Sequence, residues 1–477
     1  MERLKIALIA GAIAGSMTNF SDEGPKIYSK YQKDLCKLSE ELDFDLTIYK
    51  DIITTEKKAM EIRKEIDSKD FDFILLFQPV YISGDIVFEL MKTKAHFGLW
   101  APEEPSKEGS LPLASFVCLA QNASIAGHCF KDSKKKFKWF FGNVKSKYFK
   151  PRFEITVKAL TAVKNLKDAK VGQIGKIADG FRGMYYDERE IYKTLGINVV
   201  RGIEIEDVLA EAEKVDEKLV KAEVDRIYSA CSKIRVDDIK IIDSVKLYLA
   251  IKKICKENNF KAVALSCLPK IRVLKNMVTC LTNSLLDSIG IPSACEGDIL
   301  SAISMLILNI LSGKPTAVMD LPAFDGKDNS ILLWHCGSAP FEMADSRGVI
   351  CRKHYVTDFA KPPFDELGPI TDMIYPESNI TVFRFTGESD FFYYFEGKTF
   401  NEGKKSWDGS RGWVKELKLY DKPIKAIDLV NTIFTNNIQH HFPIVLKSVG
   451  KYIKEFAYWL DLKKIKRIEY DDSLDVD

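Results

Sequence analysis

Apolar positions in the first third of the chain alternate between short continuous runs and longer stretches with helical spacing. The runs have the length of buried strands, and the stretches between them repeat apolar residues every three or four positions. In chain order these segments are Leu4–Ala10, 24–42, Phe44–Tyr49, 55–69 and Phe71–Phe77. Such alternation is typical of a parallel sheet covered by helices on both faces. We therefore predict a Rossmann-like α/β domain over residues 1–168.

The same alternation starts again at residue 169. Strands are expected at Lys170–Ile174, Ile197–Val200 and Lys261–Ser266, and helical zones at 206–231, 240–256 and 277–289. This order predicts a second doubly wound α/β domain over residues 169–322.

The pattern changes beyond Gly337, where short apolar runs are separated by turn-rich segments. Ile380–Phe385 and Phe391–Phe395 have the character of strands, and helices are expected near 424–434 and 450–460. We predict a β-rich C-terminal domain over residues 323–477. A chain of 477 residues is long enough for two or three domains.

A stretch near the end of the second predicted domain brings two carboxylates into one unit. Its spacing predicts a helix over Asp298–Leu311 and then a short buried strand, Thr316–Met319, which Pro322 ends. Glu296 lies just before the helix, and Asp320 follows the strand. A helix start and the end of the following strand share one edge of the layer, where open α/β sheets bind ligands. We expect both carboxylates to face one pocket.

Charge and composition exclude several classes of protein. With 70 Lys and Arg against 68 Asp and Glu, the net charge of +2 gives no case for nucleic-acid binding. The densest basic run, Lys131–Lys150, is expected to be a solvated helix or a subunit-contact face. No apolar stretch has the length of a membrane span. The ten cysteines are scattered without CxxC pairs, as in reduced cytosolic proteins, so we expect a cytoplasmic protein.

Three of the six histidines lie in polar segments beside apolar runs: His335, His440 and His441. Carboxylates and imidazoles form an oxygen-rich site that suits Mn²⁺ or Mg²⁺. Cys295 and Cys336 are their neighbours, but the lack of CxxC spacing disfavours a zinc site. Catalysis by Cys336 with His335 is also disfavoured, because neighbours on a strand point to opposite faces. Each ligand candidate also fits a structural role as a helix cap, a turn or a hairpin residue.

Further polar and aromatic residues lie on expected loops. Trp100 is on a Pro-bounded loop, and His128 ends a run of small residues that leaves room for a substrate. The Gly-rich segment 175–186 carries Arg182 and Tyr185. It fits either an anion-binding turn or a plain strand-to-helix loop.

A set of motifs spread over nearly the whole chain resembles one enzyme family. The motifs are LWAPEEP at 99–105, DGFRGMYYDE at 179–188, CEGD at 295–298, MDLPAF at 319–324, LWHCGSAP at 333–340, TGES at 386–389, RGWV at 411–414 and HHFPIV at 440–445. The chain resembles the L-fucose isomerase and L-arabinose isomerase superfamily, nearer its fucose isomerase-like branch.

This resemblance implies aldose–ketose isomerisation of a monosaccharide or modified sugar through a cis-enediol, in a site that holds Mn²⁺, with Mg²⁺ or Co²⁺ as alternatives. It implies Glu296, Asp320 and His441 as ligands, with the two carboxylates as catalytic base and acid. His440 is then expected beside the ligands or on the substrate, and His335 as a ligand or substrate contact.

The resemblance further implies a barrel in the C-terminal domain and a homo-oligomer, either a trimer, a tetramer or a hexamer. Sugar contacts, some in a neighbouring subunit's site, are expected from Trp100, Asn122, His128, Arg182, Tyr185 and Trp413. Two other classes stay open: a metal-dependent sugar epimerase or lyase, and a non-catalytic sugar-binding protein.

Overall fold

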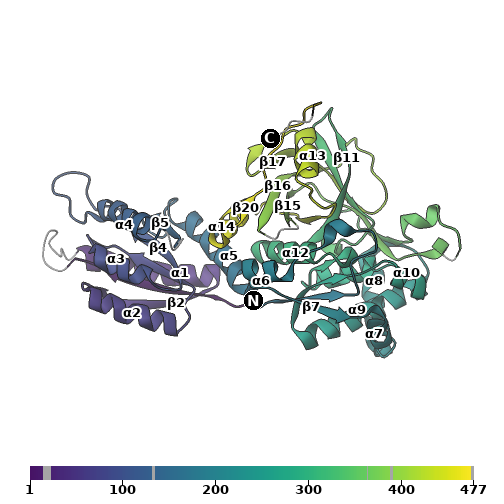
Figure 1. The fold of residues 1–477 in the computed structure, drawn as a ribbon, viewed down its shortest axis with the longest axis horizontal. Helices are drawn as coiled ribbons and strands as arrows, with labels where there is room; N and C mark the ends of the chain where they lie inside the picture. Colours follow the sequence, from purple (N-terminus) through teal and green to yellow (C-terminus); the bar gives the residue numbers. More distant parts are fainter. Residues whose placement is uncertain (14–22, 132–134, 363, 387–389, 474–477) are drawn as a thin grey trace. The chain divides into compact units, whose positions relative to one another are not determined.

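The computed structural model describes residues 1–13, 23–131, 135–362, 364–386 and 390–473 (Figure 1). Residues 132–134 of the basic run and 387–389 of the TGES motif lie outside these ranges. The chain divides into two compact units, Met1–Asn165 and Leu166–Asp477. The predicted division of the second unit at residue 322 stays a prediction.

The first unit is a parallel sheet with strand order β2-β1-β3-β4-β5. Its strands are β1 (Leu4–Gly11), β2 (Phe44–Ile53), β3 (Phe73–Phe77), β4 (His96–Ala101) and β5 (Phe137–Phe141). Its helices are α1 (Glu23–Leu42), α2 (Glu56–Ser68), α3 (Gly84–Met91), α4 (Ser115–Cys129) and α5 (Lys150–Leu166). Helices α2, α3 and α4 pack their apolar residues on one face of the sheet. The predicted α/β fold is confirmed.

Two local predictions for this unit are wrong. Trp100 lies in the central strand β4 and not on a loop; it is fully buried, and its indole Nε1 donates to Gly142 O at 2.8 Å. Its ring stacks on Tyr31 of α1, with the ring centroids 5.2 Å apart. The basic run contains the edge strand β5 where a helix was one expectation, because its aromatic residues pair with β4.

The second unit begins with a smaller parallel sheet of order β10-β9-β6-β7. Its elements are β6 (Lys170–Ile174), η1 (Arg182–Met184), α6 (Glu188–Leu195), β7 (Asn198–Ile203), α7 (Ile205–Ala212), α8 (Glu217–Ala230), α9 (Asp238–Asn258), β9 (Phe260–Leu265), α10 (Lys270–Lys275), α11 (Cys280–Ser288), β10 (Ser293–Ala294), η2 (Cys295–Gly297) and α12 (Ile299–Ser312). The second predicted parallel sheet is therefore present.

The rest of the chain forms a β-rich layer that closes into a barrel. Strands β16, β15, β19, β11, β12 and β17 pair antiparallel in that order, and β17 pairs back to β16. The elements of this region are β8 (Cys231–Arg235), β11 (Ala317–Asp325), β12 (Ser330–His335), η3 (Phe341–Met343), β13 (Val349–Arg352), η4 (Tyr355–Asp358), η5 (Phe364–Glu366), β14 (Ile370–Ile374), β15 (Asn379–Phe385), β16 (Phe391–Phe400), β17 (Ser410–Leu419), β18 (Lys422–Pro423), α13 (Ala426–Thr435), β19 (Phe442–Val445), α14 (Gly450–Leu460) and β20 (Lys463–Lys464).

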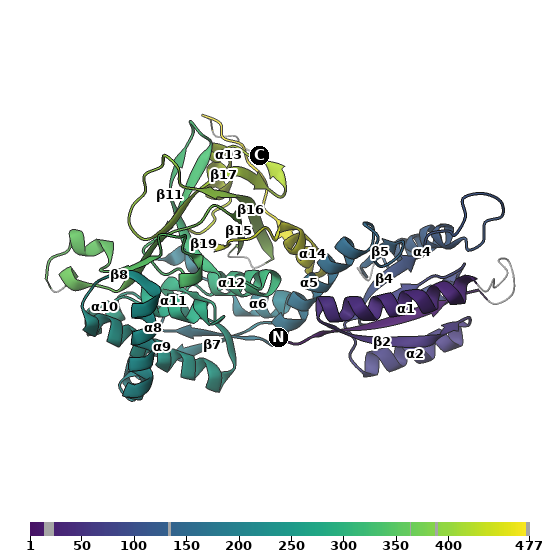
Figure 2. The ribbon, with the colours of Figure 1, turned by 180° about the vertical axis from the view of Figure 1, so that it is seen from behind.

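Helix α12 lies between the smaller parallel sheet and the barrel, in contact with β9 on one side and with β15 and β19 on the other (Figures 1 and 2). Nearly all of its residues are therefore buried, as in a helix that is apolar on every side. Asp298 is its N-cap, and Gly313 follows its end with a φ of 65°. The predicted helix is confirmed.

The strand predicted after α12 is longer than expected. Strand β11 runs through Pro322 to Asp325, with a register shift against β12 between Asp320 and Ala323. Pro322 is tolerated inside the strand because it lies at this irregularity, where a backbone N–H is not needed for the ladder. Asp320 consequently lies within β11 and not after its end.

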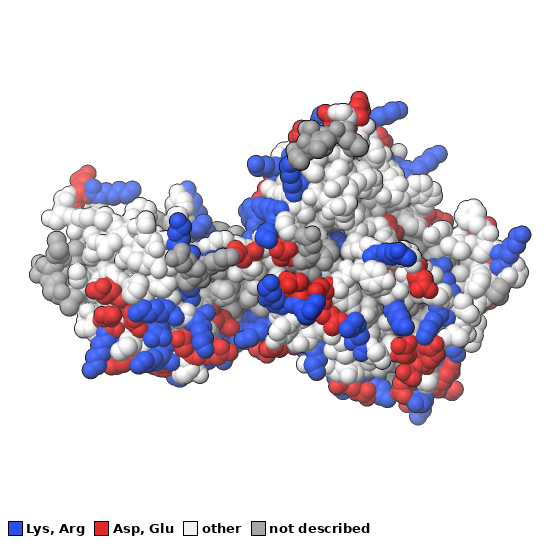
Figure 3. Space-filling model, viewed as in Figure 1, with Lys and Arg blue, Asp and Glu red and all other residues white. Residues whose placement is uncertain are grey.

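Basic and acidic side chains are interspersed on the face of the molecule shown in Figure 3, without a large area of one sign. Of the helices that the structure describes, none has both the length and the apolar character needed to cross a membrane.

Candidate functional site

Glu296 projects from a tight turn at the edge of the smaller parallel sheet. This turn, η2, follows β10 directly and leads into α12. Glu296 has a φ of 60°, in the left-handed region that residues with a Cβ rarely adopt. Gly297 has a φ of 75°, and a Cβ there would lie 2.7 Å from Lys176 O. A strained acidic residue in a closely packed turn is a frequent feature of functional sites.

The remaining ligand candidates come from three neighbouring barrel strands. In the register of β11 with β19, Met319 pairs with Phe442, so that Asp320 and His441 are the next residues along their strands. In the register of β11 with β12, Asp320 lies opposite Trp334, the residue before His335. Three adjacent strands therefore bring Asp320, His335 and His441 to one end of the barrel.

Two groups of side chains with the donor atoms to hold a metal ion meet at His441. Glu296, His440 and His441 form one, and Asp320, His335 and His441 form the other; within each, the ligand atoms lie within 4.8 Å of one another. Glu296 Oε2 is 3.3 Å from His440 Nε2 and 3.6 Å from His441 Nε2. The structure thus brings together all five of these predicted site residues.

The imidazole of His441 is held by a buried carboxylate, Asp298, which the sequence indicated only as an acidic residue in the first turn of a helix. His441 Nδ1 donates to Asp298 Oδ2 at 2.9 Å, which leaves Nε2 directed to Glu296. Asp298 also caps α12 through Ser301 N, and accepts a hydrogen bond from Arg384 Nη2 at 2.9 Å. Asp298 and Arg384 are both fully buried. A carboxylate behind a histidine is the usual arrangement for a metal-binding imidazole.

These contacts determine the charges around the centre. Burial raises the pKa of Asp298, but Arg384 and His441 outweigh it and hold that pKa far below its ordinary value. Burial likewise opposes ionisation of Glu296, yet its pKa is lowered by His440 and His441. For His441, burial lowers the pKa, and the bond to Asp298 raises it above the ordinary value overall. Both carboxyl groups are therefore ionised at neutral pH.

A divalent cation fits the residues present. Asp320 Oδ1 is buried and has no hydrogen-bond partner among the described residues, which is costly unless another group pairs with it. Carboxylate oxygens and imidazole nitrogens are donors that suit Mn²⁺ or Mg²⁺. The Asp320 carboxylate lies beside two buried histidines, His335 and His441.

The Gly-rich segment 175–186 packs on this centre. Ala178 N donates to Glu296 O at 3.3 Å, and the Phe181 ring lies 5.4 Å from that of His440. Gln439 Nε2 donates to Gly183 O. Arg182 and Tyr185 are both exposed in this segment, and their assignment as sugar contacts stays a prediction.

The other predicted sugar contacts are on other elements. Trp413 is on β17, with its Nε1 donating to Lys405 O at 3.0 Å. Asn122 and His128 are on α4 of the first unit, together with the buried Trp100 of β4. Asn122 is buried and donates to Gln78 Oε1 at 3.0 Å, whereas His128 is exposed. Their roles remain predictions.

Comparison with curated proteins identifies relatives named sulfoquinovose isomerase. That of Priestia aryabhattai is 22% identical over 415 residues, which are 86% of this chain and 89% of that protein. Those of Alkalicoccus urumqiensis and Clostridium sp. (strain MSTE9) are 24% and 25% identical over 77% and 61% of this chain, and over 80% and 64% of their own length. No family model matches the chain.

Among solved structures, the glucose-galactose binding protein GanP from Geobacillus stearothermophilus covers 66% of this chain and 93% of its own. It is 10% identical with a TM-score of 0.16, which is too low to support any statement about the fold.

Proposed function

We propose that this chain is an aldose–ketose isomerase of the fucose isomerase-like type that acts on a monosaccharide, with a sulfonated sugar as the first substrate to test. The observation that carries the proposal is that His441 belongs both to a group with Glu296 and to a group with Asp320, whose buried Oδ1 has no hydrogen-bond partner among the described residues. The names of the curated relatives support the reaction class.

In this proposal, Glu296, Asp320 and His441 hold Mn²⁺ or a similar divalent cation, which when bound polarises the oxygens on C1 and C2 of the sugar. One carboxylate removes the proton from C2 of the aldose, and a proton is returned to C1 of the resulting cis-enediol to give the ketose. The low pKa of Glu296 supports its presence as an ionised base. Asp298 keeps the His441 ring in one orientation.

The decisive experiment is a panel of aldoses and ketoses incubated with the protein and Mn²⁺, with formation of the partner sugar as the readout. The panel includes pentoses and 6-deoxy, phosphorylated and sulfonated hexoses. Glu296→Gln and Asp320→Asn are each expected to reduce turnover by about 100- to 10,000-fold, as for loss of an acid or base. Asp325→Asn, at the far end of the same strand as Asp320, is the control and is expected to keep full activity.

Retained turnover in both Glu296→Gln and Asp320→Asn would refute the mechanism. A sugar that binds but is never converted would instead identify a sugar-binding protein, and a product with inverted stereochemistry or a broken carbon chain would identify an epimerase or a lyase. We also propose that the protein is cytoplasmic and forms a homo-oligomer. Light scattering of the purified chain tests the oligomeric state directly.

Binding of Mn²⁺ is tested separately from turnover, by thermal unfolding. Mn²⁺ at 100 times its Kd is expected to stabilise the wild-type protein by about 2.7 kcal/mol, seen as a rise in Tm. The rise should be absent in Asp320→Asn and preserved in Asp325→Asn. An equal rise in all three proteins would show that Mn²⁺ binds elsewhere.

A further inference from the structure

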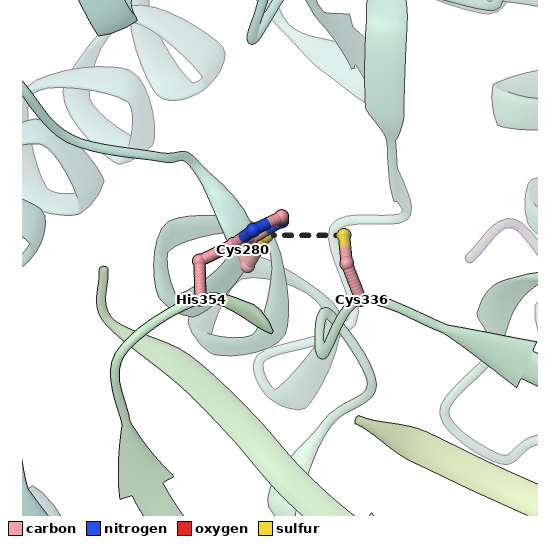
Figure 4. A group of neighbouring side chains, drawn as sticks. All are labelled: Cys280, Cys336 and His354. Atoms are coloured by element: carbon pink, nitrogen blue, oxygen red, sulfur yellow. Dashed lines mark hydrogen bonds between the residues drawn. The ribbon is translucent and has the colours of Figure 1, made fainter. Parts of the chain in front are cut away.

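Another group of potential metal ligands lies outside the carboxylate and histidine centre. Cys280 begins α11, Cys336 follows β12, and His354 lies between β13 and η4, so that separate segments supply them (Figure 4). One ligand atom of each residue lies within 4.8 Å of the other two, and the two sulfurs are 3.5 Å apart. Cys280 and His354 are each only 2% exposed.

This geometry is close to that of one tetrahedral zinc ion. Zinc binds thiolates at about 2.3 Å, which places two sulfurs of one ion about 3.7 Å from each other. Thiolate and imidazole donors select a softer ion than the carboxylate oxygens of the neighbouring centre do. The cysteine and histidine donors therefore favour zinc, whereas the carboxylate and histidine donors of the neighbouring centre favour Mn²⁺ or Mg²⁺.

Packing alone accounts for part of this arrangement, since both cysteines contact a small apolar cluster with Val278, Leu367 and Ile370. It does not account for the buried hydroxyl of Thr279, the residue before Cys280. This oxygen has no hydrogen-bond partner among the described residues. Such a buried hydroxyl requires a partner, which a water bound at this group would provide.

Binding of zinc would remove one hydrogen bond that the His354 ring now accepts. Its Nδ1 accepts from Val356 N at 3.2 Å, a long bond. Zinc on Nε2 would move the ring proton to Nδ1 and break this bond, whereas zinc on Nδ1 would replace it. Either arrangement gives up only one weak contact.

We propose that Cys280, Cys336 and His354 bind one zinc ion, with water in the fourth position. The ion joins the start of α11, the end of β12 and the segment after β13. It also reaches the first centre indirectly, because Cys336 Sγ lies 3.3 Å from His335 Nδ1. A zinc-bound thiolate accepts a hydrogen bond from that nitrogen and so orients the His335 ring. This site does not depend on the proposed isomerase activity.

The test uses Co²⁺ as a spectroscopic substitute for zinc in the reduced full-length protein. Thiolate ligands give Co²⁺ a charge-transfer band in the near ultraviolet, whereas the carboxylate and histidine centre has no sulfur ligand and gives none. The wild-type protein is expected to show this band, and added Zn²⁺ should remove it. Cys280→Ser and His354→Gln are each expected to weaken Co²⁺ binding at this site until the band is lost.

Cys255→Ser is the matched control, because Cys255 is a buried cysteine on α9, away from the cluster, and the band should remain unchanged in this variant. Circular dichroism establishes that each variant is folded; if Cys280→Ser is not, His354→Gln decides. Absence of the band in the wild-type protein, or its persistence in a folded Cys280→Ser or His354→Gln variant, would overturn the proposal. So would a disulfide between Cys280 and Cys336 in the protein as purified, detected by mass spectrometry.

Discussion

At the scale of single residues, Asp298 has the largest number of separate tasks. It caps α12, forms an ion pair with Arg384 and holds the imidazole of His441. All three partners lie where water is excluded, so Asp298 is the counter-charge of a fully buried arginine. Removing one member of a buried ion pair usually costs more than the pair itself contributes, because the other charge is left without a partner.

Asp298→Asn is therefore expected to lower the free energy of unfolding by about 3–5 kcal/mol at pH 7. Because the folded-state pKa of Asp298 lies far below its unfolded value of about 3.9, its contribution is present above pH 4 and is lost as the pH falls further. The difference between wild type and variant, measured by urea denaturation, should shrink below about pH 4. Asp325→Asn serves as the control, because Asp325 forms an ion pair with Lys404 that is only partly buried. A difference for Asp298→Asn no larger than for this control would contradict the buried-pair interpretation.

Sequence reasoning predicted a set of ligands but not the residues that position them. Motif resemblance and spacing indicated Glu296, Asp320 and His441. Asp298 looked like any acidic residue in a first helical turn, and Arg384 like a charge within a strand. The roles of these two residues depend on the contacts of Asp298 with Arg384, 86 positions later, and with His441, 143 positions later. A local pattern of apolar residues gives no information about contacts at such separations.

At the scale of elements, the turn η2 controls where Glu296 points. Its backbone passes so close to Lys176 O that only glycine fits at position 297. The opposite end of α12 has another glycine, Gly313, with a similar φ of 65°, but there a Cβ would meet no atom within 4 Å. Substitutions at Gly297 and at Gly313 can therefore be compared to separate the effect of backbone conformation on stability from that of close packing.

Gly313→Ala is expected to lower the free energy of unfolding by about 1–2 kcal/mol, the penalty of the left-handed conformation. Gly297→Ala should lower it by about 1–3 kcal/mol more, because its Cβ must also displace the 175–186 segment. Thermal or urea unfolding measures both. Of the two, only Gly297→Ala should also reduce turnover, and equal effects of the two variants would contradict the close-packing argument.

Periodicity predicted most helices and central strands, and it failed where pairing partners override local signals. Pro322 suggested the end of a strand, but β11 continues past it beside an irregularity of the ladder. The basic segment before Lys150 contains strand β5 because β4 offers it an edge. Strand β8 was missed between the helical zones predicted at 206–231 and 240–256, and it pairs with β13 more than a hundred positions later.

At the scale of the molecule, the second unit contains every proposed ligand of both metal sites. The barrel supplies Asp320, His335 and His441, and the smaller parallel sheet supplies Glu296 through η2. The sequence indicated a β-rich region, but the closing pair of β16 with β17 follows from strand register and not from any pattern of apolar residues.

A fragment comprising residues 166–477 is therefore expected to fold and to keep the rise in Tm on addition of Mn²⁺. Thermal unfolding of the fragment with and without Mn²⁺ measures this, and the fragment carrying Asp320→Asn should show no rise. A folded fragment without any Mn²⁺ response would place part of the metal site in the first unit.

The position of β19 has a consequence for how the protein matures on the ribosome. This strand fills the space between β11 and β15, and the residue before it is His441. Translation delivers Glu296, Asp320 and His335 long before it delivers this strand, so the nascent chain carries an open barrel and an incomplete set of proposed ligands until His441 and β19 have been made. Capture of the proposed metal is therefore expected only after that point, and products terminated before it lack the imidazole shared by both ligand groups.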